Sequence, residues 1–195
     1  MPTVNSNTLC VYALSVPTTS PIEVYEGTTS GDIDMANPTN GDYAIVVKTT
    51  GEWVDVFKYV TDAWVSATTG DPSDLELLSY ATSTSLEASN TINEVAARSG
   101  CGSSANYIAS GSLSWSVSVD GLLDVSTGTP DPVGSGITLM TAAQNQYYLI
   151  AKFNAGPLQS YLGQCLIGSI SFSGGVDEIA TYSTTLNGYG PLYNS

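Results

Sequence analysis

The chain has 195 residues, of which only 11% are charged, whereas roughly 25% is usual for soluble domains. It carries 18 acidic and 4 basic residues and no histidine, so its formal net charge is −14. This charge excludes a broad basic surface for nucleic acid, and the lack of histidine removes the commonest general base and metal ligand. Because Ser, Thr, Asn and Gly must then supply the polar surface, the composition predicts a mainly β protein.

The cysteines and the apolar segments point to no covalent framework and no membrane. Cys10, Cys101 and Cys165 are odd in number and widely spaced, which indicates neither a disulfide framework nor a zinc site. The first residues do not form a signal peptide, and no apolar stretch approaches the ~20 residues needed to span a bilayer. We therefore expect reduced thiols, no cofactor, no membrane contact and synthesis in the cytoplasm.

The first half of the chain divides into a short strand and an acidic region. The apolar run at residues 8–14 predicts a strand, and Pro17 and Pro21 end it. Residues 22–74 hold 10 acidic and 2 basic residues, a net charge of −8 out of the total of −14.

Three short strands form a predicted meander inside this acidic region. They cover residues 42–48, 52–59 and 63–65 and are joined by short turns. We interpret residues 16–74 as a small inserted β-rich module that sits on a larger body.

The next segments read as further strands. Residues 75–81, 84–88 and 92–97 each have strand-like composition, and a turn is expected at residues 100–102.

Residues 112–121 show the clearest pattern of the chain. Leu113, Trp115, Val117 and Val119 alternate strictly with serines, which is the period of a β-strand with one buried face. The serine face is expected to meet water or a closely packed polar neighbour.

One short helix is predicted before the last strands. After a Gly/Pro-rich loop, Ser135 is expected to cap a helix that ends near Gln144. Leu139, Met140 and Ala143 would form its buried stripe. A strand is then expected at residues 147–153.

The chain ends in a predicted hairpin. Strands at residues 161–173 and 178–186 flank the Gly174–Gly175 turn, and two glycines between alternating runs are a strong hairpin signal.

Together these segments resemble the major tail (tail tube) proteins of long-tailed bacteriophages. The resemblance rests on residues 91–95, 111–122, 168–175 and 180–190, and their order and spacing are more specific than any single segment. It extends over residues 75–193. The implied division is a tail tube β-domain made of residues 1–15 and 75–195, interrupted by the insertion at residues 16–74.

The resemblance implies a β-sandwich or barrel with one short α-helix. Subunits of such proteins form rings, usually hexameric, which stack into the tube through which DNA is ejected. The implied partners are copies of the chain, other tail proteins such as the tape measure and sheath, and DNA that passes without sticking. The implied location is the virion tail after synthesis in the host cytoplasm. Asp177 and Glu178 are candidates for the acidic wall of the lumen.

Two other function classes remain open at this stage. A β-sandwich binding or adhesion module of a phage or cell surface fits the composition, with Trp53 and Trp64 as weak candidates for sugar platforms. A glycosidase would need paired acids, and the chain offers Asp71 with Asp74 or Asp177 with Glu178. Adjacent acids are more typical of solvated turns, and no nucleophile elbow or phosphate loop is present. We therefore predict a non-enzyme with no catalytic, cofactor or metal residues.

Overall fold

The computed structural model places most of the chain, and all structural statements below concern those residues. The described residues are 10–16, 19–68, 76–78, 81–98, 104–122, 136–156, 159–175 and 180–194.

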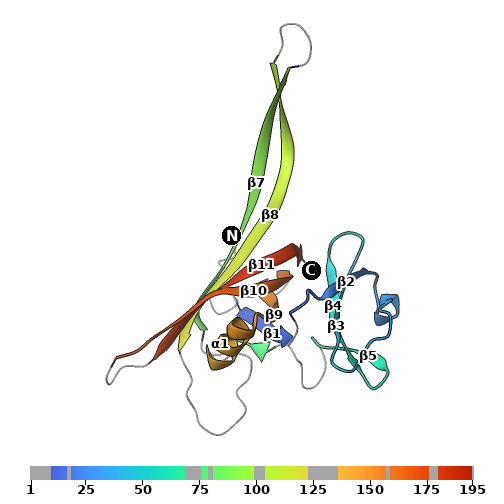
Figure 1. The fold of residues 1–195 in the computed structure, drawn as a ribbon, viewed down its shortest axis with the longest axis vertical. Coiled ribbons are helices and arrows are strands. Elements are labelled where there is room, and N and C mark those ends of the chain that lie inside the picture. The colour runs from blue at the N-terminus through green and yellow to red at the C-terminus, as the bar shows by residue number, and fades with distance from the viewer. Residues whose placement is uncertain are drawn as a thin grey trace.

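The chain forms eleven strands and one α-helix within these ranges (Figure 1). A single turn of 3₁₀ helix lies at Ser30–Asp32. The elements, in chain order, are β1 (Cys10–Val16), β2 (Glu23–Glu26), β3 (Tyr43–Val47), β4 (Trp53–Val60), β5 (Ala63–Ser66), β6 (Glu76–Leu77), β7 (Ala81–Arg98), β8 (Ser104–Leu122), α1 (Gly136–Asn145), β9 (Tyr148–Gly156), β10 (Gln159–Ser173) and β11 (Thr181–Asn194). The mainly β prediction with one short helix is confirmed.

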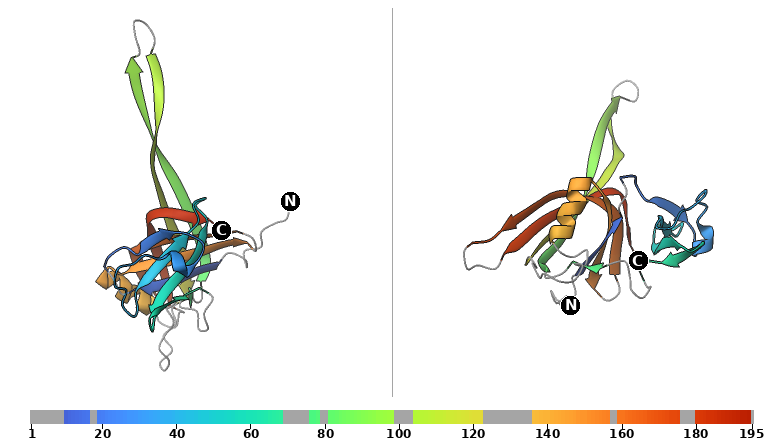
Figure 2. Two further views of the ribbon diagram at one scale, coloured as in Figure 1. Left: turned by 90° about the vertical axis from the view of Figure 1, so that its right-hand side faces the viewer. Right: turned by 60° about the horizontal axis from the view of Figure 1, so that its bottom comes forward.

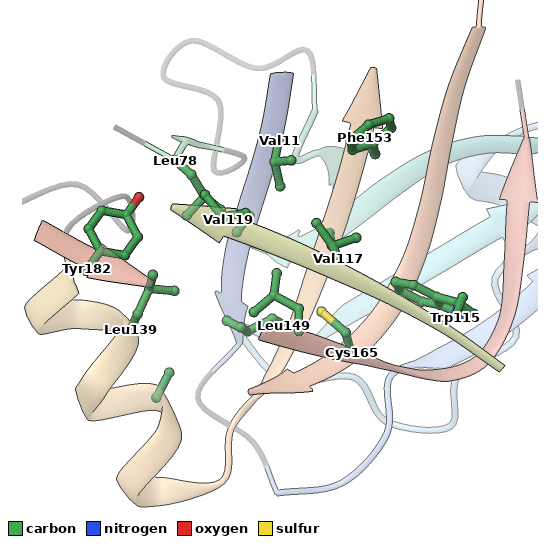
Figure 3. Packing of buried hydrophobic residues seen from close by; sticks show 14 residues of the cluster. Val11, Leu78, Trp115, Val117, Val119, Leu139, Leu149, Phe153, Cys165 and Tyr182 are labelled. Atoms are coloured by element: carbon green, nitrogen blue, oxygen red, sulfur yellow. The ribbon is translucent and has the colours of Figure 1, made fainter. Parts of the chain in front are cut away.

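Seven of the strands form one antiparallel sheet in the order β6-β1-β9-β10-β11-β8-β7. The sheet curls, so that β8 crosses over the core on the side opposite β1 and β9 (Figures 2 and 3). Helix α1 packs against the same core, with Leu139 and Ala142 buried.

The alternation in β8 places its apolar residues in this core, as predicted. Trp115, Val117 and Val119 are 5%, 1% and 0% exposed, and they pack with Val11 and Leu149 from the opposite side (Figure 3). Leu113 was expected on the same buried face, but it is 42% exposed. The prediction fails there because β8 runs from the arm into the body and reaches the core only after Leu113.

The Trp115 ring lies against two strands that carry glycine at the contact. A Cβ added at Gly163 of β10 or at Gly188 of β11 would overlap the ring. The indole N–H also donates a hydrogen bond of 3.1 Å to the carbonyl oxygen of Gly190. Gly190 has φ +74°, a left-handed conformation that favours glycine, and it lies in a bulge of β11. Trp115 therefore packs where only glycine leaves room for it.

The helix begins and ends close to the predicted limits, but its buried side differs. Leu139 and Ala142 are buried, whereas Met140 and Ala143, which were predicted to be buried with Leu139, are only partly covered. The side of α1 that is buried depends on the direction from which the sheet approaches the helix. The local sequence pattern does not record that direction. Ser135, the predicted cap, lies outside the described residues.

Three strands are much longer than predicted. β8 begins at Ser104, whereas the strand predicted there began at residue 112. β7 runs without interruption through residues expected to form two strands with a break between them, and only β6 remains of the strand expected at 75–81. β11 continues to Asn194 instead of ending near residue 186. The residues added to β7 are mainly small and polar, and those added to β11 include Gly188, Gly190 and Pro191, so both segments carry a weak strand signal although their backbones are paired. The turn predicted at 100–102 lies outside the described residues.

The second sheet has four strands in the order β2-β3-β4-β5. The predicted meander is confirmed as β3, β4 and β5, while β2 was not predicted and runs parallel to β3. Its buried residues share a core with Ile150 of β9 and Leu162 of β10, so the second sheet packs on the outer face of the first. The assignment of residues 16–74 as an insertion stays a prediction.

Trp115→Ala should destabilise the protein by about 3–5 kcal/mol, because it removes a buried aromatic ring and leaves a cavity that the glycine surfaces cannot fill. The free energy of unfolding is measured by denaturant titration. Leu113→Ala, on the same strand and exposed, is the control and should cost less than about 1 kcal/mol. A Trp115→Ala protein as stable as the control would contradict the core position of the ring.

Candidate assembly surface

The described residues contain no cluster of the kind that metal or acid–base chemistry requires. Within the placed ranges, no group of three or more His, Cys, Asp or Glu side chains is positioned to hold a metal ion. The buried polar side chains there, Gln164 and Thr184, both hydrogen-bond to backbone groups. The acids considered for a glycosidase or for the lumen wall lie outside the described residues, namely Asp71, Asp74, Asp177 and Glu178.

The two tryptophans considered as sugar platforms are both engaged within the protein. Trp53 is partly buried beneath Lys152, whose Nζ lies 4.8 Å from the ring centroid. Trp64 makes an edge contact with Tyr59, with ring centroids 5.1 Å apart. The structure does not bring the two indoles together into one flat exposed platform.

The largest surface feature is a two-stranded arm. Only residues 116–122 of β8 pair with β11 and Trp115 still lies in the core, so residues 89–98 of β7 and 104–114 of β8 extend beyond the sheet as an isolated ribbon. Figures 1 and 2 show this arm projecting well away from the body of the protein. With about 3.3 Å per residue, eleven paired residues span about 35 Å. The sequence analysis predicted strands at residues 92–97 and 112–121 but none at residues 104–111, and it gave no sign that these strands leave the core.

Both backbone edges of the arm are free of partners within the described part of the chain. β7 pairs with β8 alone, and the distal part of β8 pairs with β7 alone. Residues 88–115 include one acidic and one basic residue, Glu94 and Arg98, in a chain with a net charge of −14. A long edge with so few charges is a ready template for another strand.

A second surface lies on the outside of β7, β8, β11 and β10, and we call it the hydroxyl face. Cross-strand pairs such as Ser85–Ser118, Ser118–Thr185 and Ser169–Thr185 place small hydroxyl residues side by side. Its other members are Ser83, Ser89, Ser114, Ser116, Ser171, Ser173, Thr181 and Ser183, with Glu87, Asp120 and Asn187.

The hydroxyl face is nearly flat and carries no cation. Two shallow hollows of about 320 Å³ and 240 Å³ mark it, the first lined by Glu87, Ser114 and Asn187, and the second by Asp120, Ser171 and Ser183. The predicted serine side of residues 112–121 forms its centre. Small side chains let another polar surface approach closely, which the sequence pattern had indicated.

The three lysines each contact an acidic or aromatic side chain of the same subunit, and Lys48 does so at the surface. Lys48 forms an ion pair with Glu52 at 2.6 Å, and Lys58 lies over the Tyr43 ring at 5.5 Å. Lys152 is half-buried under Trp53, and burial lowers the pKa of its amino group, while nearby Asp55 opposes that change. These three lysines contact acidic or aromatic side chains of the same subunit, and they do not form a patch for phosphate groups.

Comparison with known proteins gives these surfaces their context. The sequence profile described as phage tail tube protein matches residues 64–194, about two thirds of the chain. The chain belongs to the phage tail tube protein family. It is therefore a structural protein of the virion tail, as predicted. No curated protein sequence matches it.

The fold of this tail tube protein is similar to that of a solved tail protein, and two further structures show a weaker similarity. A chain in the tail of an empty gene transfer agent particle with C6 symmetry aligns with TM-score 0.51 and 15% identity, over 72% of this chain and 94% of that one. A chain of the native gene transfer agent virion gives TM-score 0.49 and 14% identity, over 62% and 88%. The SPP1 tail tube protein gives TM-score 0.41 and 16% identity, over 71% and 73%. No helix in the described ranges combines the length and apolar character needed to cross a bilayer.

Cys165 should report on the integrity of the tail tube protein's core. Its side chain is fully buried, and burial raises the pKa of the thiol to about 12, so the reactive thiolate is scarce at neutral pH. We expect no alkylation of Cys165 by iodoacetamide at pH 8 in the native protein and complete alkylation in denaturant. Peptide mass spectrometry measures both, and rapid labelling of the native protein would contradict the burial.

Proposed function

We propose that copies of this protein assemble into rings, six-membered like the usual hexamers of the family, and that these rings stack into a DNA-conducting tail tube. The observation that carries the proposal is the arm formed by residues 89–98 and 104–114, which leaves its own body with both edges unpaired.

The arm supports assembly because an isolated two-stranded ribbon is marginally stable in water. Its low charge places little electrostatic repulsion in the way of a neighbour, although the whole chain is strongly acidic. A neighbouring copy that contacts the ribbon covers its backbone groups and removes the exposed edge.

The geometry of the contact favours a ring or a stack over a simple symmetric pair. The arm projects from one part of the subunit, and the body that would receive it is a different surface (Figures 1 and 2). Contacts between unlike surfaces are head-to-tail, and they generate closed rings or continuing filaments. A stack of rings combines the two kinds of assembly, because each ring is closed and the stack continues through the arm.

The charge of the protein suits a channel through which DNA moves. DNA carries one negative charge per ~1.7 Å of helix axis, so a basic wall would hold it. The hydroxyl face carries no lysine or arginine, and we propose it as a surface that can lie near DNA without binding it. Asp177 and Glu178 remain predicted contributors to this wall.

The remaining partners follow from the same role. Other tail proteins, among them a tape measure and, in a contractile tail, a sheath, would contact the inside and outside of the tube. We propose no catalytic activity, since membership of a structural family accounts for the protein.

Replacing the arm by a tight turn tests the proposal. Ser89 and Ser114 are directly paired, and an Asn-Gly turn between them would join β7 to β8 with a two-residue hairpin loop. We expect the shortened protein to fold and to keep its melting temperature within a few degrees, because the arm contributes little to the core. We also expect it to form no tubes in negative-stain electron microscopy at concentrations where the full chain does.

The control keeps the arm and changes an exposed residue of the second sheet, Val65→Thr. This variant should assemble like the unchanged chain. Tubes of normal length from the armless protein would show that the arm is not required for stacking.

A further inference from the structure

Gln164 of β10 makes an unusual pair of contacts with a residue 142 positions away. Its Oε1 accepts a hydrogen bond of 2.8 Å from the backbone N–H of Ile22, and its Nε2 donates one of 2.6 Å to the backbone carbonyl of Ile22. A single side-chain amide thus satisfies both backbone groups of one residue, as a paired strand would. Ile22 stands directly before β2, where the chain enters the second sheet.

Neither partner can exchange these hydrogen bonds for water easily. Gln164 is 7% exposed and Ile22 is 6% exposed. A buried backbone donor and acceptor left without partners carry the full cost of desolvation. The backbone groups of Ile22 therefore need the Gln164 amide as a hydrogen-bond partner, and this is not an incidental surface contact.

Other contacts attach the second sheet at separate places. Ile45 and Val56 share a core with Ile150 and Leu162 of the seven-stranded sheet. Glu52, just before β4, forms an isolated parallel β-bridge through its backbone with Asn194 at the end of β11. Contacts at several separated points hinder rotation of one body on another, whereas a single tether does not.

At the centre of this contact, Lys152 of β9 lies over the ring of Trp53 of β4. A cation over an aromatic face is attracted by the ring, and more strongly when the pair is shielded from water. Lys152, Ile150 and Gln164 occupy one face of the seven-stranded sheet, since Gln164 pairs with Ile150 and Lys152 lies two residues farther along β9. The face that receives the second sheet is therefore built by β9 and β10 together.

The opposite face of β10 holds the root of the arm. Gly163, the residue before Gln164, contacts the Trp115 ring of β8. A register shift in the pairing with β11 falls between Gly163 and Gln164. Two consecutive residues of one strand thus carry the arm's root on one side and the entry of the second sheet on the other.

We propose that Gln164 is a positioning residue that locks the second sheet, within residues 19–68, onto the seven-stranded sheet. The second sheet is then a fixed outer layer of the tube wall, not a decoration on a flexible tether. The lock acts within one subunit, so it holds before assembly and does not depend on the proposed rings.

Gln164→Leu tests the lock, because leucine retains most of the side-chain volume and removes both hydrogen bonds. We expect amide hydrogen exchange at Ile22 and in β2 to become at least about tenfold faster, which corresponds to the loss of one or two buried hydrogen bonds. Exchange in β8 and the β8-paired part of β11 should stay unchanged. Gln164→Asn keeps the amide but shortens the side chain, and it should give the same local effect.

Gln159→Leu is the matched control, because Gln159 lies on the same strand, is exposed and donates its side-chain hydrogen bond to the hydroxyl of Tyr161 in that same strand. It should leave exchange in β2 unaltered. Unchanged exchange at Ile22 and β2 in Gln164→Leu would overturn the proposal. So would an equal loss of protection in β8, or failure of both Gln164 variants to fold, since Gln164 would then act on the whole protein.

A second measurement concerns the outer layer in assembled tubes. Averaged electron microscopy images of Gln164→Leu tubes should keep the inner wall and lose definition in the layer contributed by residues 19–68. Equally sharp outer density would count against the lock. If the unchanged chain forms no tubes, the proposed function fails, and the exchange experiment on the purified chain still decides the role of Gln164.

Discussion

The contact of the Trp115 ring with Gly163 and Gly188 governs how the seven-stranded sheet curls. Three strands, β8, β10 and β11, meet at this ring, and the absence of Cβ atoms on two of them lets it lie close to their backbones. The hydrogen bond from its indole to Gly190 ties the bulge of β11 to the same point. Beyond this ring the core ends, and β8 continues outward with β7 as the arm. A single side chain thus lies at the boundary between the folded body and the part of the subunit that reaches outward.

The body and the arm of the protein have opposite physical requirements. The body satisfies its strands internally, with apolar residues from both sides of the curled sheet and from α1 in one core. The arm has no core of its own within the described residues, and its edges lack partners. Membership of the tail tube family gives this contrast a purpose, because a subunit that builds a tube must leave part of its bonding capacity for its neighbours.

The charge distribution follows the same division of roles. The three lysines lie against acidic or aromatic side chains of their own subunit, and acidic residues outnumber basic ones by 18 to 4 in the whole chain. The hydroxyl face and the arm are the regions where this acidity is weakest. Neither surface offers a cluster of cations that would hold a polyanion, and the low charge of the arm leaves little repulsion between subunits that contact each other through it.

The sequence by itself determined the β class, the buried alternation of β8, the short helix, the closing hairpin and the family. These are local properties, since a period of two residues or a turn signal is read from neighbours in the chain. Only the tertiary structure decided that Leu113 is exposed, that β7 runs unbroken into an arm, and that Gln164 holds Ile22. Exposure depends on where the core ends, and the Gln164 contact joins residues 142 positions apart. Strand pairing and sheet packing bring such residues together, and no local pattern of residue types records which distant surface will cover them.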